Sequence, residues 1–133
     1  MKMKRREILA GAMGAAVAGA AATVGAADAQ PAARLRHVVL FKFKDGAAEA
    51  DIRAVENAFR GLAVKIDLIR EFEWGTNNSP EGLAQGYTHC FFVTLATAEA
   101  RDAYLPHPAH KAFVDVLKPV LDKVLVVDYW AKP

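Results

Sequence analysis

The residues best suited to chemistry form one run of seven, Tyr104-Leu105-Pro106-His107-Pro108-Ala109-His110, which holds a phenol and two of the four histidines of the chain. Pro108 suits the first turn of a helix, where its missing N–H is no loss, so the run predicts a helix over 108–118 with His110 in its first turn. The positive end of the helix dipole disfavours an imidazolium there and favours a neutral His110 that can act as a base. The alternative is structural, with His107 capping the helix and His110 half-buried at the surface.

The other two histidines lie on predicted strands. Alternation places His37 on one face with Phe41, and His89 on one face with Phe91, and both faces can point toward the helices. A neutral imidazole on an apolar strand needs a hydrogen-bond partner. We therefore expect a small polar cluster in an apolar pocket between sheet and helices, although for His89 a structural role is the favoured interpretation. The residues expected to line this pocket are His37, Phe41, His89, Tyr104 and His107.

Apolar periodicity along the chain predicts four strands and three helices. The predicted elements are a strand over 35–44, a helix over 48–61, strands over 66–74 and 86–95, helices over 98–104 and 108–118, and a strand over 120–130. This β-α-β-β-α-α-β order predicts an α+β fold, a ferredoxin-like sandwich with a four-stranded antiparallel sheet and helices on one face.

The face of the sheet without helices should be polar if it meets water. The sequence instead predicts an apolar second face, made of Val38, Leu40, Ile69, Cys90, Phe92, Val124 and Val126. We expect a second copy of the chain to cover it, giving a two-fold homodimer in which two sheets form one barrel. The alternative is that the C-terminal segment or the leader folds over this face. Among its apolar neighbours the lone Cys90 is predicted to be a buried small hydrophobe rather than a nucleophile.

The first 29 residues have the pattern of a secretory leader, with a basic start followed by an apolar run rich in Ala and Gly. The pair Arg5 and Arg6 fits a twin-arginine signal, and small residues predict cleavage between Ala29 and Gln30. A retained membrane anchor is the alternative, but the run holds little Leu or Ile. The predicted organisation is a signal peptide over 1–29, a linker over 30–34 and one domain over 35–133. The protein is accordingly expected in the periplasm or outside the cell, and at a membrane only during export.

Removing this leader changes the charge balance. The chain has 17 Lys and Arg against 15 Asp and Glu; the leader holds four of the basic and two of the acidic residues, which leaves 13 of each. A balanced domain without a basic stripe gives no support for nucleic-acid binding.

Four segments carry a resemblance to a known family: the strand over 37–44, the segment Gly86-Tyr87-Thr88-His89, the run from Tyr104 through His110 to Phe113, and Val127-Asp128-Tyr129 near the C-terminus. The sequence over 35–130 resembles the stress-responsive dimeric α/β-barrel (Dabb) family. That family includes stress-induced proteins beside plant polyketide cyclases of the olivetolic acid cyclase type. The resemblance implies that His37, Tyr104 and His110 occupy the catalytic positions of the cyclases, with His110 as base, Tyr104 as hydrogen-bond donor and His37 orienting the substrate.

Three functions follow in order of preference. The first is an exported homodimer that binds a small apolar or aromatic molecule. The second is a cofactor-independent cyclase or lyase that uses His110, Tyr104 and His37, for which neither a metal nor an organic cofactor is expected. The third is a metal site of His107 and His110 with a strand histidine; it ranks last because no carboxylate or thiolate lies nearby in sequence to complete it.

Overall fold

The computed structural model describes residues 34–133. Residues 1–33 lie outside this part of the chain, and with them the predicted signal residues Arg5 and Arg6 and the predicted cleavage site between Ala29 and Gln30. Within residues 34–133 no helix has both the length and the apolar character needed to cross a membrane.

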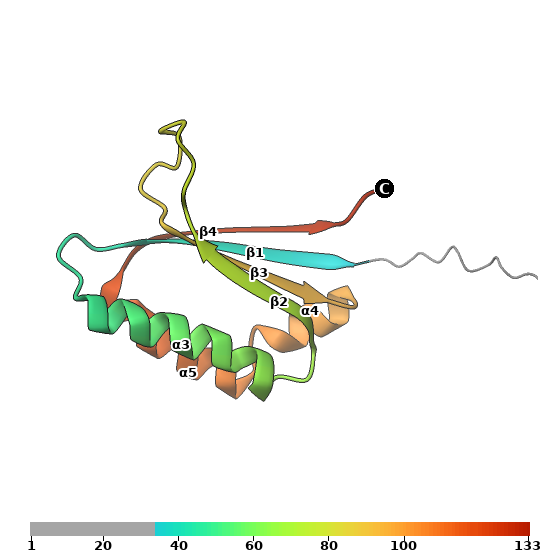
Figure 1. Ribbon diagram of the computed structural model, residues 1–133. Helices are drawn as coiled ribbons and strands as arrows, with labels where there is room; N and C mark the ends of the chain where they lie inside the picture. Colours follow the sequence, from blue (N-terminus) through green and yellow to red (C-terminus); the bar gives the residue numbers. More distant parts are fainter. Residues whose placement is uncertain (1–33) are drawn as a thin grey trace, which may run out of the picture. The chain divides into compact units, whose positions relative to one another are not determined.

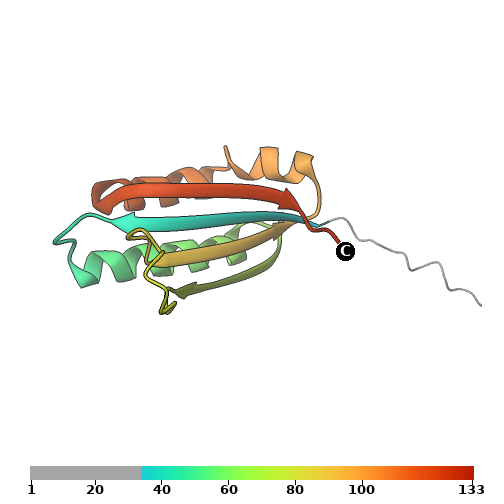
Figure 2. The same ribbon diagram turned by 90° about the horizontal axis from the view of Figure 1, so that it is seen from above.

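One antiparallel sheet with helices on a single face makes up the described domain (Figures 1 and 2). Its elements are β1 (Leu35–Phe43), α3 (Glu49–Lys65), β2 (Ile69–Thr76), β3 (His89–Leu95), α4 (Ala98–Tyr104), α5 (Pro108–Leu117), the short 3-10 helix η1 (Lys118–Val120) and β4 (Leu121–Trp130). The strands lie in the order β2-β3-β1-β4 and every neighbouring pair is antiparallel. The predicted ferredoxin-like α+β fold and its element order are therefore confirmed.

The boundaries differ from the prediction around the two strands that follow α3. Helix α3 continues past Gly61 to Lys65, and Ile66 is its buried C-cap residue rather than the first residue of β2. Strand β3 begins at His89 and not at residue 86, because Gln85 and Gly86 both adopt positive φ angles, which interrupt extended backbone. The connection between β2 and β3 rises from the sheet on the side opposite the helices (Figure 1).

Strict alternation along β1 sets which side chains enter the core. Leu35, His37, Val39, Phe41 and Phe43 are buried, while the residues between them are half-exposed. The centre of the core is aromatic, since the rings of residues 59 and 91 stack with centroids 4.2 Å apart. This packing holds the helices against the face of the sheet on which the side chain of His37 lies.

The open face of the sheet is apolar, but its membership differs from the prediction. Residues directly opposite each other in an antiparallel pair share a face. Val126 and Val124 lie opposite the inward residues Val39 and Phe41, so they belong to the helix side of edge strand β4, and Ile69 packs against the core. The apolar side chains on the open face are Val38, Leu40, Cys90, Phe92, Leu125, Val127 and Tyr129.

The prediction that Cys90 is buried is wrong for the single chain, where it is exposed on this open face. The cause is strand parity, because Cys90 lies opposite Leu40 rather than opposite an inward residue of β1. Partial burial raises the pKa of its thiol, and the charge of Glu73 acts in the same direction, so the group is a weak nucleophile.

Candidate functional site

Three residues far apart in sequence meet on the helix side of the sheet. The imidazole of His37 on β1 lies edge-on to the phenol of Tyr104 at the end of α4, with ring centroids 5.6 Å apart. The ring of His110 in the first turn of α5 lies 4.8 Å from the same phenol. Tyr104 thus stands between two imidazoles, and we call these three residues the His–Tyr–His cluster.

Two side-chain caps fix where helices α4 and α5 begin, and these helices carry Tyr104 and His110. The Thr97 hydroxyl accepts a hydrogen bond from the Ala100 N–H at 3.0 Å and starts α4. His107 caps α5, since its Nδ1 accepts a hydrogen bond from the Ala109 N–H at 3.0 Å. The structural alternative for His107, in which it caps the helix, is therefore confirmed, while its role in binding a substrate stays a prediction.

Tyr104 is fully buried, and its hydroxyl has no hydrogen-bond partner among residues 34–133. Burial raises the pKa of the phenol far above its usual value, so the hydroxyl stays protonated at neutral pH. A buried polar group without a partner is costly and uncommon in a folded protein. This hydroxyl is a hydrogen-bond donor that an oxygen of a ligand could satisfy.

His110 is only half-buried and is the member of the cluster that solvent reaches most easily. Desolvation is the largest cause that lowers the pKa of its imidazole, and the nearby imidazoles of His37 and His107 act in the same direction. A hydrogen bond with the backbone of Leu105 opposes them in part. His110 is therefore neutral at pH 7, as a general base must be.

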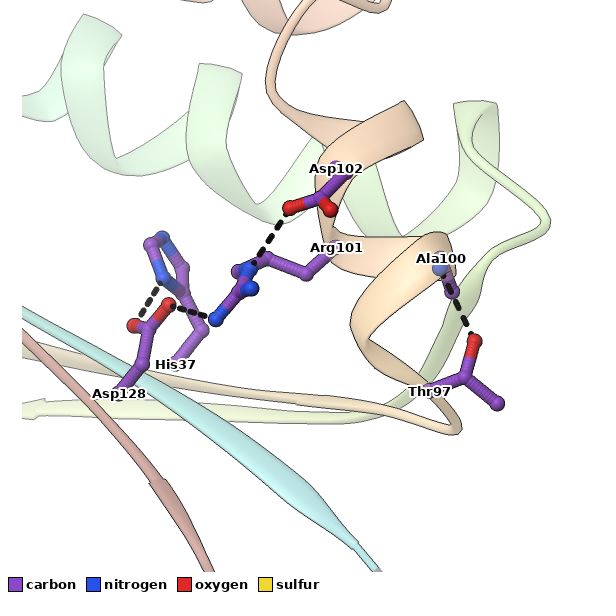
Figure 3. A network of polar contacts seen from close by, with 6 residues as sticks. All are labelled: His37, Thr97, Ala100, Arg101, Asp102 and Asp128. Carbon is purple, nitrogen blue, oxygen red and sulfur yellow. Dashed lines mark hydrogen bonds and ion pairs between the residues drawn. The ribbon is translucent and has the colours of Figure 1, made fainter.

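Sequence reasoning missed the partners of His37. Its Nδ1 lies 2.7 Å from an oxygen of Asp128 on β4, and the other oxygen of Asp128 lies 3.3 Å from the guanidinium of Arg101 on α4 (Figure 3). His37 is 4% exposed, so this carboxylate supplies the partner that the buried imidazole requires. One signal was available, namely an acidic residue within the apolar run that ends the chain.

The structure does not bring His89 to the cluster. On β1 the residue opposite His89 is Phe41, four positions from His37, or about 13 Å along the strand. The imidazole of His89 lies between Glu56, at 2.7 Å from its Nε2, and the Thr88 hydroxyl, at 2.8 Å from its Nδ1. These contacts agree with the favoured structural interpretation of this histidine.

Phe41 is a core residue at 1% exposure rather than an open pocket wall. Its ring stacks on that of Phe113 at 6.2 Å, and Phe113 in turn lies 6.3 Å from the ring of His110. Among the ring contacts of residues 34–133, Phe41 reaches the His–Tyr–His cluster through Phe113.

A cavity of about 510 Å³ lies on the open face, beneath the connection between β2 and β3. Leu40, Cys90 and Leu125 line it from the sheet, and residues of the 77–88 connection line its other side. None of the three cluster residues lines it. It is thus a different feature from the pocket predicted between sheet and helices.

In the described part of the chain, no three side chains from His, Cys, Asp and Glu are placed to hold a metal ion together. The third hypothesis, a histidine metal site, therefore has no ligand set within residues 34–133.

Comparisons with known proteins identify the family of this chain. The Stress responsive A/B Barrel Domain profile matches residues 35–131. The stress-response A/B barrel domain-containing protein HS1 of Arabidopsis thaliana is 41% identical over 95 residues, covering 71% of this chain and 87% of the relative. Olivetolic acid cyclase of Cannabis sativa is 32% identical over 95 residues, covering 71% of this chain and 94% of the cyclase.

A solved structure from Jannaschia sp. is described as a dimeric ferredoxin-like protein of unknown function. It is 28% identical with a TM-score of 0.64, and the match covers 72% of this chain and 97% of that one. The shared fold and the extent of these matches lead to one assignment. This chain belongs to the stress-responsive A/B barrel domain family.

Proposed function

We propose that the protein is a homodimer that binds a small apolar or aromatic carbonyl compound beside His110 and removes a proton from the carbon next to the carbonyl group. The observation that carries this proposal is the Tyr104 hydroxyl, which is buried without a partner among residues 34–133 and lies between two imidazoles. A ligand carbonyl oxygen would accept the hydrogen bond that this hydroxyl has free. Stress-protective binding and acid–base chemistry would use the same three residues.

The residues divide the reaction as follows. The C–H bond breaks, its proton moves to the neutral ring of His110, and the electron pair is delocalised onto the carbonyl oxygen. Tyr104 donates its hydrogen bond to that oxygen, where the negative charge develops, and His37 borders the reacting group. No cofactor takes part in these steps.

The cyclase relative supports an intramolecular form of this chemistry. The enolate carbon would attack a second carbonyl of the same molecule, forming a carbon–carbon bond and closing a ring. The proton held by His110 would then pass to the new alkoxide, which returns the base to its neutral state.

The test is deuterium exchange into the methyl group of acetophenone, a small aromatic ketone, followed by proton NMR in heavy water at neutral pH. The proposal predicts exchange faster with the protein than with free imidazole at the same concentration, because His110 and Tyr104 act together. A rate no higher than that of imidazole would refute the acid–base function and leave a binding role.

The homodimer is proposed to form through the open face, whose apolar side chains would otherwise meet water. The dimeric description of the Jannaschia neighbour supports a homodimer, and the apolar open face is the surface proposed for it. Val127→Asp should break the dimer, because two-fold symmetry would bury the new charge twice. We expect its dissociation constant to rise by at least about a hundredfold in sedimentation equilibrium.

Val64→Asp is the matched control for this experiment. Val64 is 84% exposed on α3, on the opposite side of the sheet, so the same substitution should leave the dimer intact. Equal dimerisation of both variants, or a monomeric unaltered protein at micromolar concentration, would contradict the interface.

Export is proposed from the leader sequence. Replacing Arg5 and Arg6 together by Lys should stop removal of the leader, because twin-arginine transport depends on this pair. The size of the protein in the periplasmic fraction measures the result. Processing that continues unchanged would show another route of export, and an unshortened protein in the unaltered strain would contradict cleavage at Ala29.

A further inference from the structure

Arg101 lies between two carboxylates at the edge of the His–Tyr–His cluster (Figure 3). Its Nε is 3.1 Å from Asp102 and its Nη1 is 3.3 Å from Asp128. The second oxygen of Asp128 contacts Nδ1 of His37 at 2.7 Å. A chain of polar contacts therefore runs from α4 across β4 to a buried imidazole on β1.

The donor and acceptor types along this chain fix the position of one proton. An ionised carboxylate can only accept, so His37 must carry its proton on Nδ1 to bond Asp128. A neutral His37 then has a lone pair on Nε2. That nitrogen lies on the side of the ring away from the strands, toward the helices (Figure 3). The phenol of Tyr104 belongs to that same helix side.

Arg101 is poorly placed to bind an anionic ligand. Its single positive charge already faces the carboxylates of Asp102 and Asp128, so the three groups together carry a net negative charge. Its side chain is also mostly buried, with 28% exposed. The effect of Arg101 on the cluster must therefore pass through Asp128.

We propose that Arg101 is a positioning residue that acts through Asp128 to hold His37 as the Nδ1–H tautomer, with Nε2 free to accept a hydrogen bond at the cluster. The guanidinium of Arg101 hydrogen-bonds one oxygen of Asp128, and Nδ1 of His37 hydrogen-bonds the other. These two contacts fix the orientation of the carboxylate toward His37. This inference rests on the proposed role of His37 in the cluster. Its test does not require turnover.

The test uses ¹⁵N-labelled protein, because imidazole nitrogen shifts distinguish a nitrogen that carries a proton from one that carries a lone pair. In the unaltered dimer, Nδ1 of His37 should carry the proton. Arg101→Met keeps the aliphatic stem but removes the donor, and should give a mixture of both tautomers. Arg53→Met is the control, because the exposed Arg53 pairs with Glu49 within its own helix and should leave the His37 signals unchanged.

Asp128→Asn provides a sharper variant that keeps the shape of the side chain. Arg101 can only donate, so it must face the amide oxygen, which turns the amide NH₂ toward His37. Nδ1 of His37 must then accept, and the proton should move fully to Nε2. In the double variant Arg101→Met with Asp128→Asn the amide is free to turn, so the mixture should return.

Two results would overturn the proposal. The first is an Asp128→Asn variant whose His37 keeps its proton on Nδ1. The second is an Arg101→Met variant whose His37 signals match the unaltered protein. Acetophenone exchange should fall about tenfold in Arg101→Met, because His37 would then be misoriented at the cluster. Absence of exchange in the unaltered protein would instead count against the proposed function, and the tautomer result would stand by itself.

Discussion

Replacing His110 by alanine is expected to abolish the exchange of acetophenone methyl protons that we propose for this protein. General base catalysis contributes about 10²- to 10⁴-fold, and His110 is the neutral, half-buried imidazole of the cluster. The measurement is the exchange rate at neutral pH. Lys111→Ala is the matched control, since Lys111 is exposed on the same helix and should retain the rate. A His110→Ala variant with the rate of the control would remove His110 from the mechanism.

The pH dependence of exchange follows from the environment of the same residue. Desolvation lowers the pKa of His110 below its ordinary value of 6.5, so the base form is complete before neutral pH. The rate should rise with pH through this lowered pKa and be level at pH 7. The unfolded chain binds this proton at higher pH than the folded protein, so the contribution of His110 to stability is present above about pH 6.5 and is lost as pH falls toward the folded pKa.

Tyr104→Phe is expected to separate activity from stability. Exchange should fall by about a hundredfold, because the lost hydrogen bond acts where the oxyanion develops. The free energy of unfolding should stay the same or rise by up to about 1 kcal/mol, because the variant removes a buried hydroxyl that has no partner among residues 34–133. Urea unfolding and the exchange rate measure the two effects.

Tyr87→Phe is the control for this substitution. Tyr87 lies in the connection between β2 and β3 and lines the open-face cavity, which none of the three cluster residues lines, so removal of its hydroxyl should change neither the exchange rate nor the fold. If Tyr104→Phe lost about 2 kcal/mol or more of stability, its hydroxyl would have a partner after all, and its availability to a ligand would be contradicted.

Local patterns predicted most of this fold. Alternation in β1 placed His37 on the helix side, and Pro108 marked the first turn of α5. The errors arose where register or backbone conformation decides the outcome. Val124 and Val126 were assigned to the wrong face because the pairing of β4 with β1 depends on a partner strand about 85 positions away in sequence, which periodicity within β4 cannot supply.

The candidate site was predictable in part. Tyr104 and His110 are close in sequence, strand alternation placed His37 on the same side of the sheet, and the resemblance added its catalytic role. The contacts of Asp128 and Arg101 with His37 depend on how α4 sits over the edge of the sheet, and no local pattern encodes that placement. His89 has the same strand parity as His37, yet it meets Glu56 because it lies four positions further along the sheet.

We propose that the Tyr104 hydroxyl and the His110 imidazole receive the carbonyl group of a ligand, and a crystal structure of the protein with acetophenone would show it. We expect the ketone oxygen within about 2.6–3.2 Å of the Tyr104 hydroxyl, with the methyl carbon facing the His110 ring. Acetophenone bound only in the open-face cavity, away from all three cluster residues, would contradict it.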